Sequence, residues 1–322
     1  MVKKSIFSNP LVIDGSMSTS LERLGCDTDN ELWTAAALLN QPELVYQVHK
    51  EYFEAGARLA ITDTYQANLP ALKKAGLTER QARQVIEKAV ELAKQARDDY
   101  EAESGVHGYV AGSLGPYGAY LANGSEYRGD YELTAAEYQA FYRPRLEAII
   151  NAGVDCLALE TQPKLSEVKA VLDLLKNEYS DQRVYVSFTL KDAETISEGT
   201  KLTDAAKAVS QYDQVIGVGI NCIPPRLVTP AIRKLKEATE LPIIVYPNSG
   251  ASYDAATKTW SAAPAEDDFG KLTKEWLLAG ASAIGGCCTT TPADIAKIAA
   301  VLIMSSRKSR DFSHGMDRPT MI

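Results

Sequence analysis

The sequence predicts a single (β/α)8 barrel of the TIM type, a fold of the α/β class. Eight short apolar segments alternate with helical segments along the 322 residues, and no linker or low-complexity stretch divides them. In three places, at 54–62, 151–161 and 278–288, a helical segment closes on Ala-Gly and an apolar segment follows at once. An open, doubly wound sheet is the alternative that this pattern leaves. We expect the barrel domain over residues 1–304 and a polar C-terminal tail over residues 305–322.

The other strands and helices follow from the same two patterns. Short apolar segments without alternation are typical of strands that are buried on both faces. Five more of them complete the eight expected strands: Leu11–Ile13, His107–Ala111, Val184–Leu190, Val215–Ile220 and Pro242–Tyr246. Apolar residues recur at helical spacing in the segments 42–53, 82–100 and 134–153. We expect Pro144 to kink the third of these helices or to start it.

Composition and charge limit the kind of partner. The chain has 34 Lys+Arg against 42 Asp+Glu and a net charge of -8, which gives no field to attract nucleic acid or an anionic membrane. No segment approaches the roughly 18 apolar residues that cross a bilayer. The first residues lack the apolar stretch of a signal peptide, so we expect a cytoplasmic protein whose five cysteines remain thiols. A neutral, cationic or zwitterionic small molecule is the expected partner.

Polar and glycine-rich residues follow most of the expected strands. In a parallel barrel the carboxyl ends of all strands meet at one mouth, where the chemistry of such enzymes is carried out. The first strand leads into Asp14, Gly15 and Ser16, the fourth ends in Glu160, and the sixth ends in Asn221. We therefore expect one site that these residues share.

Three cysteines give this site its chemistry. Cys222 follows the sixth strand, and Cys287 and Cys288 follow the eighth, so a barrel brings their sulfurs within reach of one tetrahedral metal. Three thiolates without a fourth protein ligand form the open pattern of a catalytic Zn²⁺ site. The preceding Gly285 and Gly286 allow close backbone approach. Tight packing of small buried residues is the alternative explanation.

The remaining candidates are weaker. His49 lies in a helical segment, His107 at a strand start and His314 in the expected tail, so none is well placed as a base or ligand. Lys191 follows the fifth strand and is a surface lysine or, as the alternative, a Schiff-base nucleophile. The tyrosine-rich segment 115–131 is either a lid, a cation-binding wall or a well-packed long loop.

Eight motifs together resemble the cobalamin-independent homocysteine S-methyltransferases, which use S-methylmethionine or S-adenosylmethionine. The resemblance runs from about Leu11 to about Val301, and the pair GINC and GGCC is its most specific part. The motifs are DGSMSTSLERLGCD, TYQA, GSLGPYGAYLANGSEYRGDY, LETQPKLSEV, ISEGT, GINC, VYPNSG and GGCCTTTPADI. Two residues depart from the family pattern: Asp63, where relatives tend to have a small residue, and Thr289, where Arg or Gly is common.

The resemblance implies a barrel with zinc on Cys222, Cys287 and Cys288. It also implies that Asp14 and Glu160 lie near the amino group of L-homocysteine. We expect the backbone amides of Gly15 and Ser16 to bind the substrate carboxylate, Asn221 to contribute to the same site, and Tyr117 to line the pocket of a sulfonium methyl donor.

The expected reaction is methyl transfer to the thiolate of homocysteine, which gives methionine. Coordination to zinc removes the thiol proton, so no histidine base is required. A sulfonium donor suits an anionic nucleophile because both charges disperse in the transition state. Betaine as the donor, a non-catalytic zinc-thiolate redox sensor and a Schiff-base lyase are the alternatives that the sequence leaves open.

Overall fold

The computed structural model describes residues 6–28, 30, 32–250, 253–254, 259–260 and 268–314. Its central sheet has eight parallel strands in the order β1-β10-β7-β6-β5-β4-β3-β2. The ring closes between the first and last strands of this order, β1 and β2. Ile13 and Leu59 form a parallel β-bridge there, and the Arg58 amide donates to the Val12 carbonyl at 2.8 Å. The strands are β1 (Leu11–Val12), β2 (Leu59–Ile61), β3 (Tyr109–Leu114), β4 (Cys156–Gln162), β5 (Val184–Phe188), β6 (Val215–Asn221), β7 (Ile243–Tyr246) and β10 (Ala281–Ile284). The predicted barrel is confirmed.

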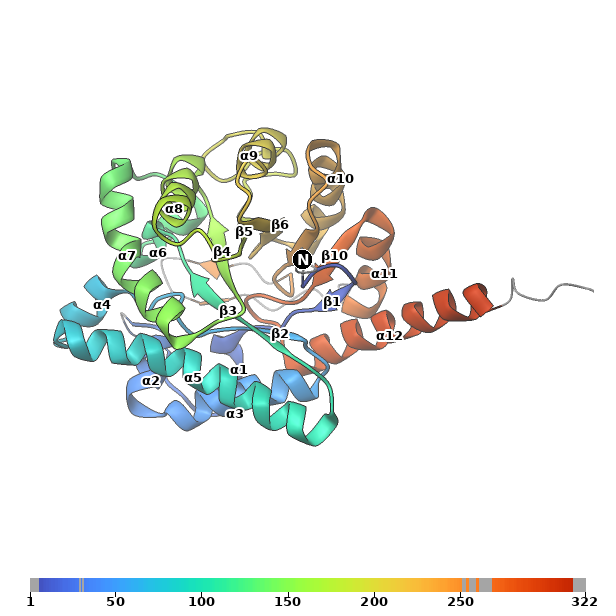
Figure 1. The fold of residues 1–322 in the computed structure, drawn as a ribbon, viewed down its shortest axis with the longest axis horizontal. Helices are drawn as coiled ribbons and strands as arrows, with labels where there is room; N and C mark the ends of the chain where they lie inside the picture. Colours follow the sequence, from blue (N-terminus) through green and yellow to red (C-terminus); the bar gives the residue numbers. More distant parts are fainter. Residues whose placement is uncertain are drawn as a thin grey trace, which may run out of the picture.

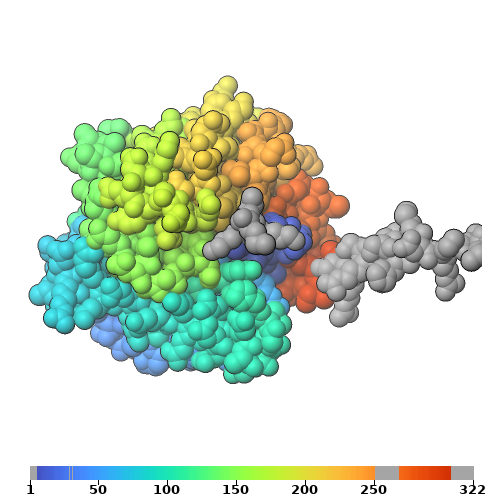
Figure 2. Space-filling model, in the orientation of Figure 1, coloured from blue at the N-terminus to red at the C-terminus, as the bar shows by residue number. Residues whose placement is uncertain are grey.

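Helices cover the outside of this ring, as Figure 1 shows. In the space-filling view their colours follow one another around the molecule in chain order, and the strands are hidden beneath them (Figure 2). The helices are α1 (Met17–Arg23), α2 (Ala35–Asn40), α3 (Pro42–Glu54), α4 (Leu69–Lys74), α5 (Glu79–Ser104), α6 (Tyr117–Tyr120), α7 (Ala135–Ala152), α8 (Leu165–Glu178), α9 (Leu202–Val209), α10 (Val228–Ala238), α11 (Phe269–Ala279) and α12 (Pro292–His314). No helix in the described part of the chain is long and apolar enough to cross a membrane.

Local sequence signals set the helix ends. The Ala-Gly junctions end helices as predicted: Gly56, Gly153 and Gly280 have φ values of 105°, 83° and 115°, a region that glycine enters without strain. Thr78 and Thr134 begin α5 and α7 with capping boxes.

Three details differ from the sequence expectations. Pro144 lies inside α7 and neither starts nor ends it, since the helix runs from Ala135 to Ala152. The last helix, α12, continues to His314, so residues 305–314 of the expected polar tail are helical. A short antiparallel pair, β8 (Tyr253–Asp254) and β9 (Thr259–Trp260), was not predicted.

Candidate active site and metal centre

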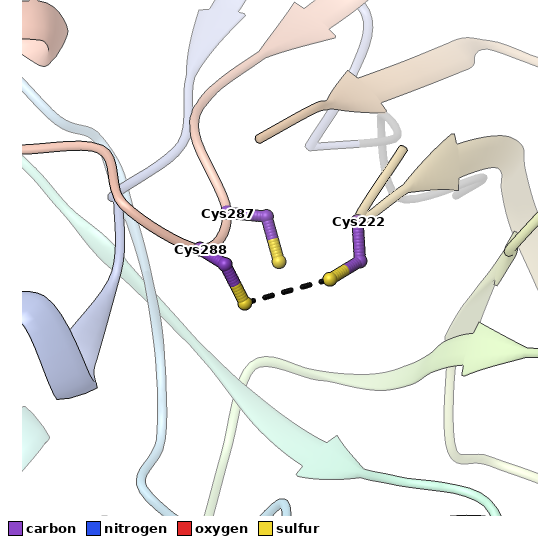
Figure 3. Close-up of side chains that lie close together, drawn as sticks. All are labelled: Cys222, Cys287 and Cys288. Atoms are coloured by element: carbon purple, nitrogen blue, oxygen red, sulfur yellow. Dashed lines mark hydrogen bonds between the residues drawn. The ribbon is translucent and has the colours of Figure 1, made fainter. Parts of the chain in front are cut away.

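The sulfurs of Cys222, Cys287 and Cys288 meet at the carboxyl end of the barrel. All three lie within 4.8 Å of one another, and Cys222 Sγ is 3.5 Å from Cys288 Sγ. In Figure 3 Cys222 extends from the end of β6, and the other two extend from the loop that follows β10. The predicted cluster is present, and the three residues could hold a metal ion.

The backbone around the cysteines is held by neighbouring strand ends. The Cys222 amide donates to Tyr246 O at 3.2 Å, and the Cys287 amide donates to Pro247 O at 2.8 Å. A Cβ on Gly285 would lie 2.7 Å from Ile13 Cβ, and one on Gly286 would lie 2.2 Å from Thr290 Oγ1. Glycine is therefore required at both positions so that the loop can pack against the end of β1.

The protonation of the cluster follows from its geometry. The thiols of Cys287 and Cys288 hydrogen-bond toward Cys222, which lowers the pKa of Cys222 well below its usual value and raises the pKa of the other two. Tyr127 Oη lies 3.3 Å from the Cys222 sulfur. A divalent cation at this cluster is the group that would stabilise all three thiolates.

A cavity of about 720 Å³ opens above the cysteines. It is lined by the carboxyl ends of β2, β4 and β7 and by the segments after β1, β2, β3, β6 and β10. All five non-glycine residues with positive φ in the described part of the chain lie on its wall: Trp33, Ala122, Thr161, Cys222 and Thr289. Backbone strain concentrated in this way is typical of a functional site.

Asp14 and Glu160 both line this cavity and are buried. Asp14 Oδ2 accepts a hydrogen bond from the Ile61 amide at 2.8 Å, and Glu160 Oε1 accepts one from the Ser113 hydroxyl. Burial raises the pKa of Glu160 to about 7, and it raises that of Asp14 well above its usual value, with a further contribution from the charge of Glu160. Two interacting carboxylates in one cavity favour a cationic ligand group between them.

Asn221 is placed differently from the prediction. Its side chain is fully buried and does not line the cavity. Its Oδ1 accepts hydrogen bonds from the Thr161 amide and the Ser187 hydroxyl, each at 2.8 Å, and its Nδ2 donates to Thr161 Oγ1 at 2.8 Å. Nδ2 also lies 3.9 Å from the Cys287 sulfur. Asn221 therefore positions the residue after Glu160 and one metal-site sulfur.

Gly15 and Ser16 line the cavity, but the Ser16 amide already donates to Thr290 Oγ1 at 3.2 Å. The Ser16 hydroxyl caps α1 by accepting from the Thr19 amide. The expectation that the Ser16 amide is available for a substrate carboxylate therefore does not agree with the structure. Gly15 has a packing role as well, because a Cβ there would lie 2.8 Å from Tyr52 Cε1.

Tyr117 also lies outside the cavity lining. Its ring packs against Phe141, Tyr120 and Tyr131, and its amide donates to Glu167 Oε1 at 2.6 Å. The segment 119–127 of the same loop does reach the cavity. The aromatic rings on the cavity wall are instead Trp33, Tyr65, Tyr127 and Tyr246.

Two further acidic residues belong to the cavity wall, and the sequence analysis did not identify either as a site residue. Asp63 and Glu126 line the cavity, and burial raises the pKa of each to about 7. One carboxylate oxygen of each is buried without a hydrogen-bond partner in the described part of the chain. For Asp63 a sequence signal existed, since it departs from the family pattern.

The weaker candidates stay outside the site. His49 is buried in α3, and burial lowers its pKa to about 4. His107 is exposed beside Glu101, and the side chain of His314 lies outside the described residues. Lys191 is exposed and does not line the cavity, which leaves a Schiff-base lyase without its nucleophile.

A parallel barrel with three cysteines that could hold a metal, beneath a cavity of buried acids, is the arrangement of a barrel enzyme with an open metal centre. The homocysteine S-methyltransferase family model matches residues 11–302, and the chain belongs to this family. It is 48% identical to the homocysteine S-methyltransferase of Escherichia coli (strain K12), covering 90% of this chain and 94% of that one. It is 45% identical to YbgG of Bacillus subtilis (strain 168), a homocysteine S-methyltransferase, covering 90% and 93%. It is 38% identical to a selenocysteine methyltransferase of Astragalus bisulcatus, covering 94% of each.

Solved structures agree with this assignment. The metallated form of the homocysteine methyltransferase MmuM from Escherichia coli matches with a TM-score of 0.83 and 45% identity, over 91% of this chain and 96% of that one. The apo form of the same enzyme matches with a TM-score of 0.74 and 39% identity, over 91% and 96%. The family, enzyme class and barrel implied by the sequence motifs are confirmed.

Proposed function

We propose that this chain transfers a methyl group from a sulfonium donor, S-methylmethionine or S-adenosylmethionine, to L-homocysteine, with Zn²⁺ as its resident metal. The sulfur of homocysteine gains the methyl group and loses its proton, and the donor sulfonium becomes a neutral thioether. The observation that carries this proposal is the three-sulfur cluster at one cavity with two buried carboxylates. The thiols suit a reducing compartment, so we also place the protein in the cytoplasm.

The donor set fits zinc. With Zn–S bonds of about 2.3 Å in tetrahedral geometry, ligand sulfurs lie about 3.8 Å apart. The 3.5 Å separation of the Cys222 and Cys288 sulfurs is close to this value. Soft thiolates favour zinc over the hard cations magnesium and calcium. When bound, Zn²⁺ would hold the substrate sulfur as a thiolate at neutral pH.

The two carboxylates select the amino-acid end of the substrate. Asp14 and Glu160 place negative charge in the cavity. Among the described residues, no basic side chain forms an ion pair with either of them. The ammonium group of homocysteine supplies the positively charged partner that the two carboxylates lack, through charge-assisted hydrogen bonds. A thiol without an amino group leaves both carboxylates unpaired and binds less well.

The remaining work of the protein is to position a cationic donor in line with the thiolate. Trp33, Tyr65 and Tyr127 present aromatic surface to the cavity, which suits a cation and excludes water. Glu167 holds the loop that carries Tyr127, because it accepts hydrogen bonds from the Tyr131 hydroxyl and the Tyr117 amide.

The proposal is tested by methionine formation from L-homocysteine with S-methylmethionine, S-adenosylmethionine or betaine, with zinc measured in the same preparation. We expect turnover with a sulfonium donor at a rate well above that with betaine. A preparation that uses betaine better than both sulfonium compounds would overturn the donor class. A preparation that binds zinc but forms no methionine with any donor would favour the redox sensor.

A further inference from the structure

One acidic residue on the cavity wall has no role in the reaction described so far. Asp63 follows β2 and is 4% exposed. Its Oδ1 accepts a hydrogen bond from Thr34 Oγ1 at 2.5 Å, and its Oδ2 has no partner in the described part of the chain. Among those residues no lysine or arginine forms an ion pair with it.

Such a residue is costly to the fold. Burial raises the pKa of Asp63 to about 7 even though the hydrogen bond from Thr34 lowers it. A carboxylate inside protein is normally paired with a cation or with several donors. Asp63 has one donor and forms part of a binding cavity, so a ligand group is the natural source of the missing partner.

Asp63 follows β2, which lies opposite β6 in the ring of eight strands, whereas Cys222 follows β6. Burial and the charges of Asp27 and Asp63 raise the pKa of Cys26, a cavity residue in the loop after α1. Burial and the nearby charge of Cys222, in contrast, raise the pKa of Glu126 and of Glu160. A ligand group that faces Asp63 therefore lies across the ring from Cys222.

We propose that Asp63 is a specificity-determining residue that binds the α-ammonium group of an amino-acid sulfonium donor such as S-methylmethionine. This inference rests on the proposed function. The sulfonium group of the donor has no N–H and has to lie beside the thiolate that it methylates. The α-ammonium group of the same donor has three hydrogen-bond donors and can reach a carboxylate farther away. Asp14 and Glu160 serve the ammonium of homocysteine. Glu126 is next to Tyr127, whose hydroxyl lies 3.3 Å from the Cys222 sulfur, so Asp63 is the buried acid left for the ammonium of the second amino acid.

The test compares Asp63→Asn with the unmodified chain on two donors. S-Methyl-L-methionine carries the ammonium, and 4-dimethylsulfoniobutanoate keeps the sulfonium and the carboxylate but lacks the ammonium. Asparagine keeps the size of the side chain and an acceptor for Thr34. At pH 8 we expect the substitution to raise KM and the calorimetric Kd for S-methyl-L-methionine at least tenfold, to change kcat less than threefold, and to leave the deaminated donor within twofold.

Asp181→Asn is the matched control, since it removes the same charge at an exposed position outside the cavity. Equal losses on both donors, or no loss on S-methyl-L-methionine, would overturn the role of Asp63. Absence of S-methyl-L-methionine binding to the unmodified chain would overturn it as well. If that chain binds both sulfonium compounds and methylates homocysteine with neither, the proposed function fails, and the ratio of Kd values still decides the role of Asp63.

Discussion

Glu160→Gln tests how the site recognises homocysteine. The substitution keeps the shape of the side chain and an oxygen that accepts from the Ser113 hydroxyl. It removes the charge that the substrate ammonium requires. The zinc ligands are untouched, so the metal content of the variant should equal that of the unmodified chain.

The magnitude follows from the hydrogen bond that is lost. A hydrogen bond to a charged group contributes about 1.5 to 3 kcal/mol, or about ten- to a hundredfold in kcat/KM. Because burial raises the pKa of Glu160 to about 7, about half of this carboxyl is protonated at neutral pH. The ionised form binds the ammonium, so the loss in the variant should grow from pH 6 to pH 8.

The assay measures kcat/KM at saturating donor for L-homocysteine and for 4-mercaptobutanoate, which lacks the amino group. We expect at least a tenfold loss on homocysteine at pH 8 and less than a threefold change on 4-mercaptobutanoate. Glu240→Gln, at an exposed position, is the control for loss of one negative charge. Equal losses on the two thiols would contradict this role, since they would assign Glu160 to the fold or to the metal site.

Three further predictions concern the surroundings of the site. Gly286→Ala should lower zinc content and activity together while the far-ultraviolet circular dichroism spectrum is kept, because the new Cβ would lie 2.2 Å from Thr290 Oγ1; a fully metallated variant would contradict this. Asn221→Ala should lower the free energy of unfolding by about 3 kcal/mol and kcat at least tenfold, because it leaves buried groups of Thr161 and Ser187 unpaired; unchanged kcat would contradict the positioning role. Asp63→Asn should stabilise the fold above pH 7 by about 4 kcal/mol, from the rise of its pKa from 3.8 to about 7 on folding, and should have no effect below about pH 3, where both states hold the proton. Urea unfolding between pH 4 and pH 8 measures this gain, which should increase as the pH rises from 4 to 7; a pH-independent difference would show that the charge is not responsible.

The barrel was predictable because its signals are local. A helix that closes on Ala-Gly needs a left-handed glycine, and the structure places Gly56, Gly153 and Gly280 in that conformation. The cysteine cluster was predictable because barrel topology brings strand ends together whatever their separation in sequence. Cys222 and Cys287 are 65 positions apart, and both lie at the carboxyl end of the same ring.

Side-chain direction at the strand ends was not predictable in the same way. Asn221 follows the last apolar residues of β6, but only the packing of β4 and β5 decides that its amide bonds Thr161 and Ser187 rather than facing the cavity. Tyr117 and Tyr127 lie in one tyrosine-rich loop, and long-range hydrogen bonds to Glu167 decide which of them reaches the sulfurs. Residues 305–314 are helical, but their sequence has no apolar periodicity from which a helix could be predicted.

In the proposed reaction, one metal on three cysteine thiolates makes the homocysteine thiol reactive. The most direct measurement is zinc content and methionine formation in one preparation of the unmodified chain and of Cys222→Ser, Cys287→Ser and Cys288→Ser, with Cys26→Ser and Cys156→Ser as controls. We expect about one zinc per chain in the unmodified protein and the controls, and loss of metal and activity together in the other three. A metal-free preparation with full activity, or full activity after loss of any one of the three cysteines, would contradict it.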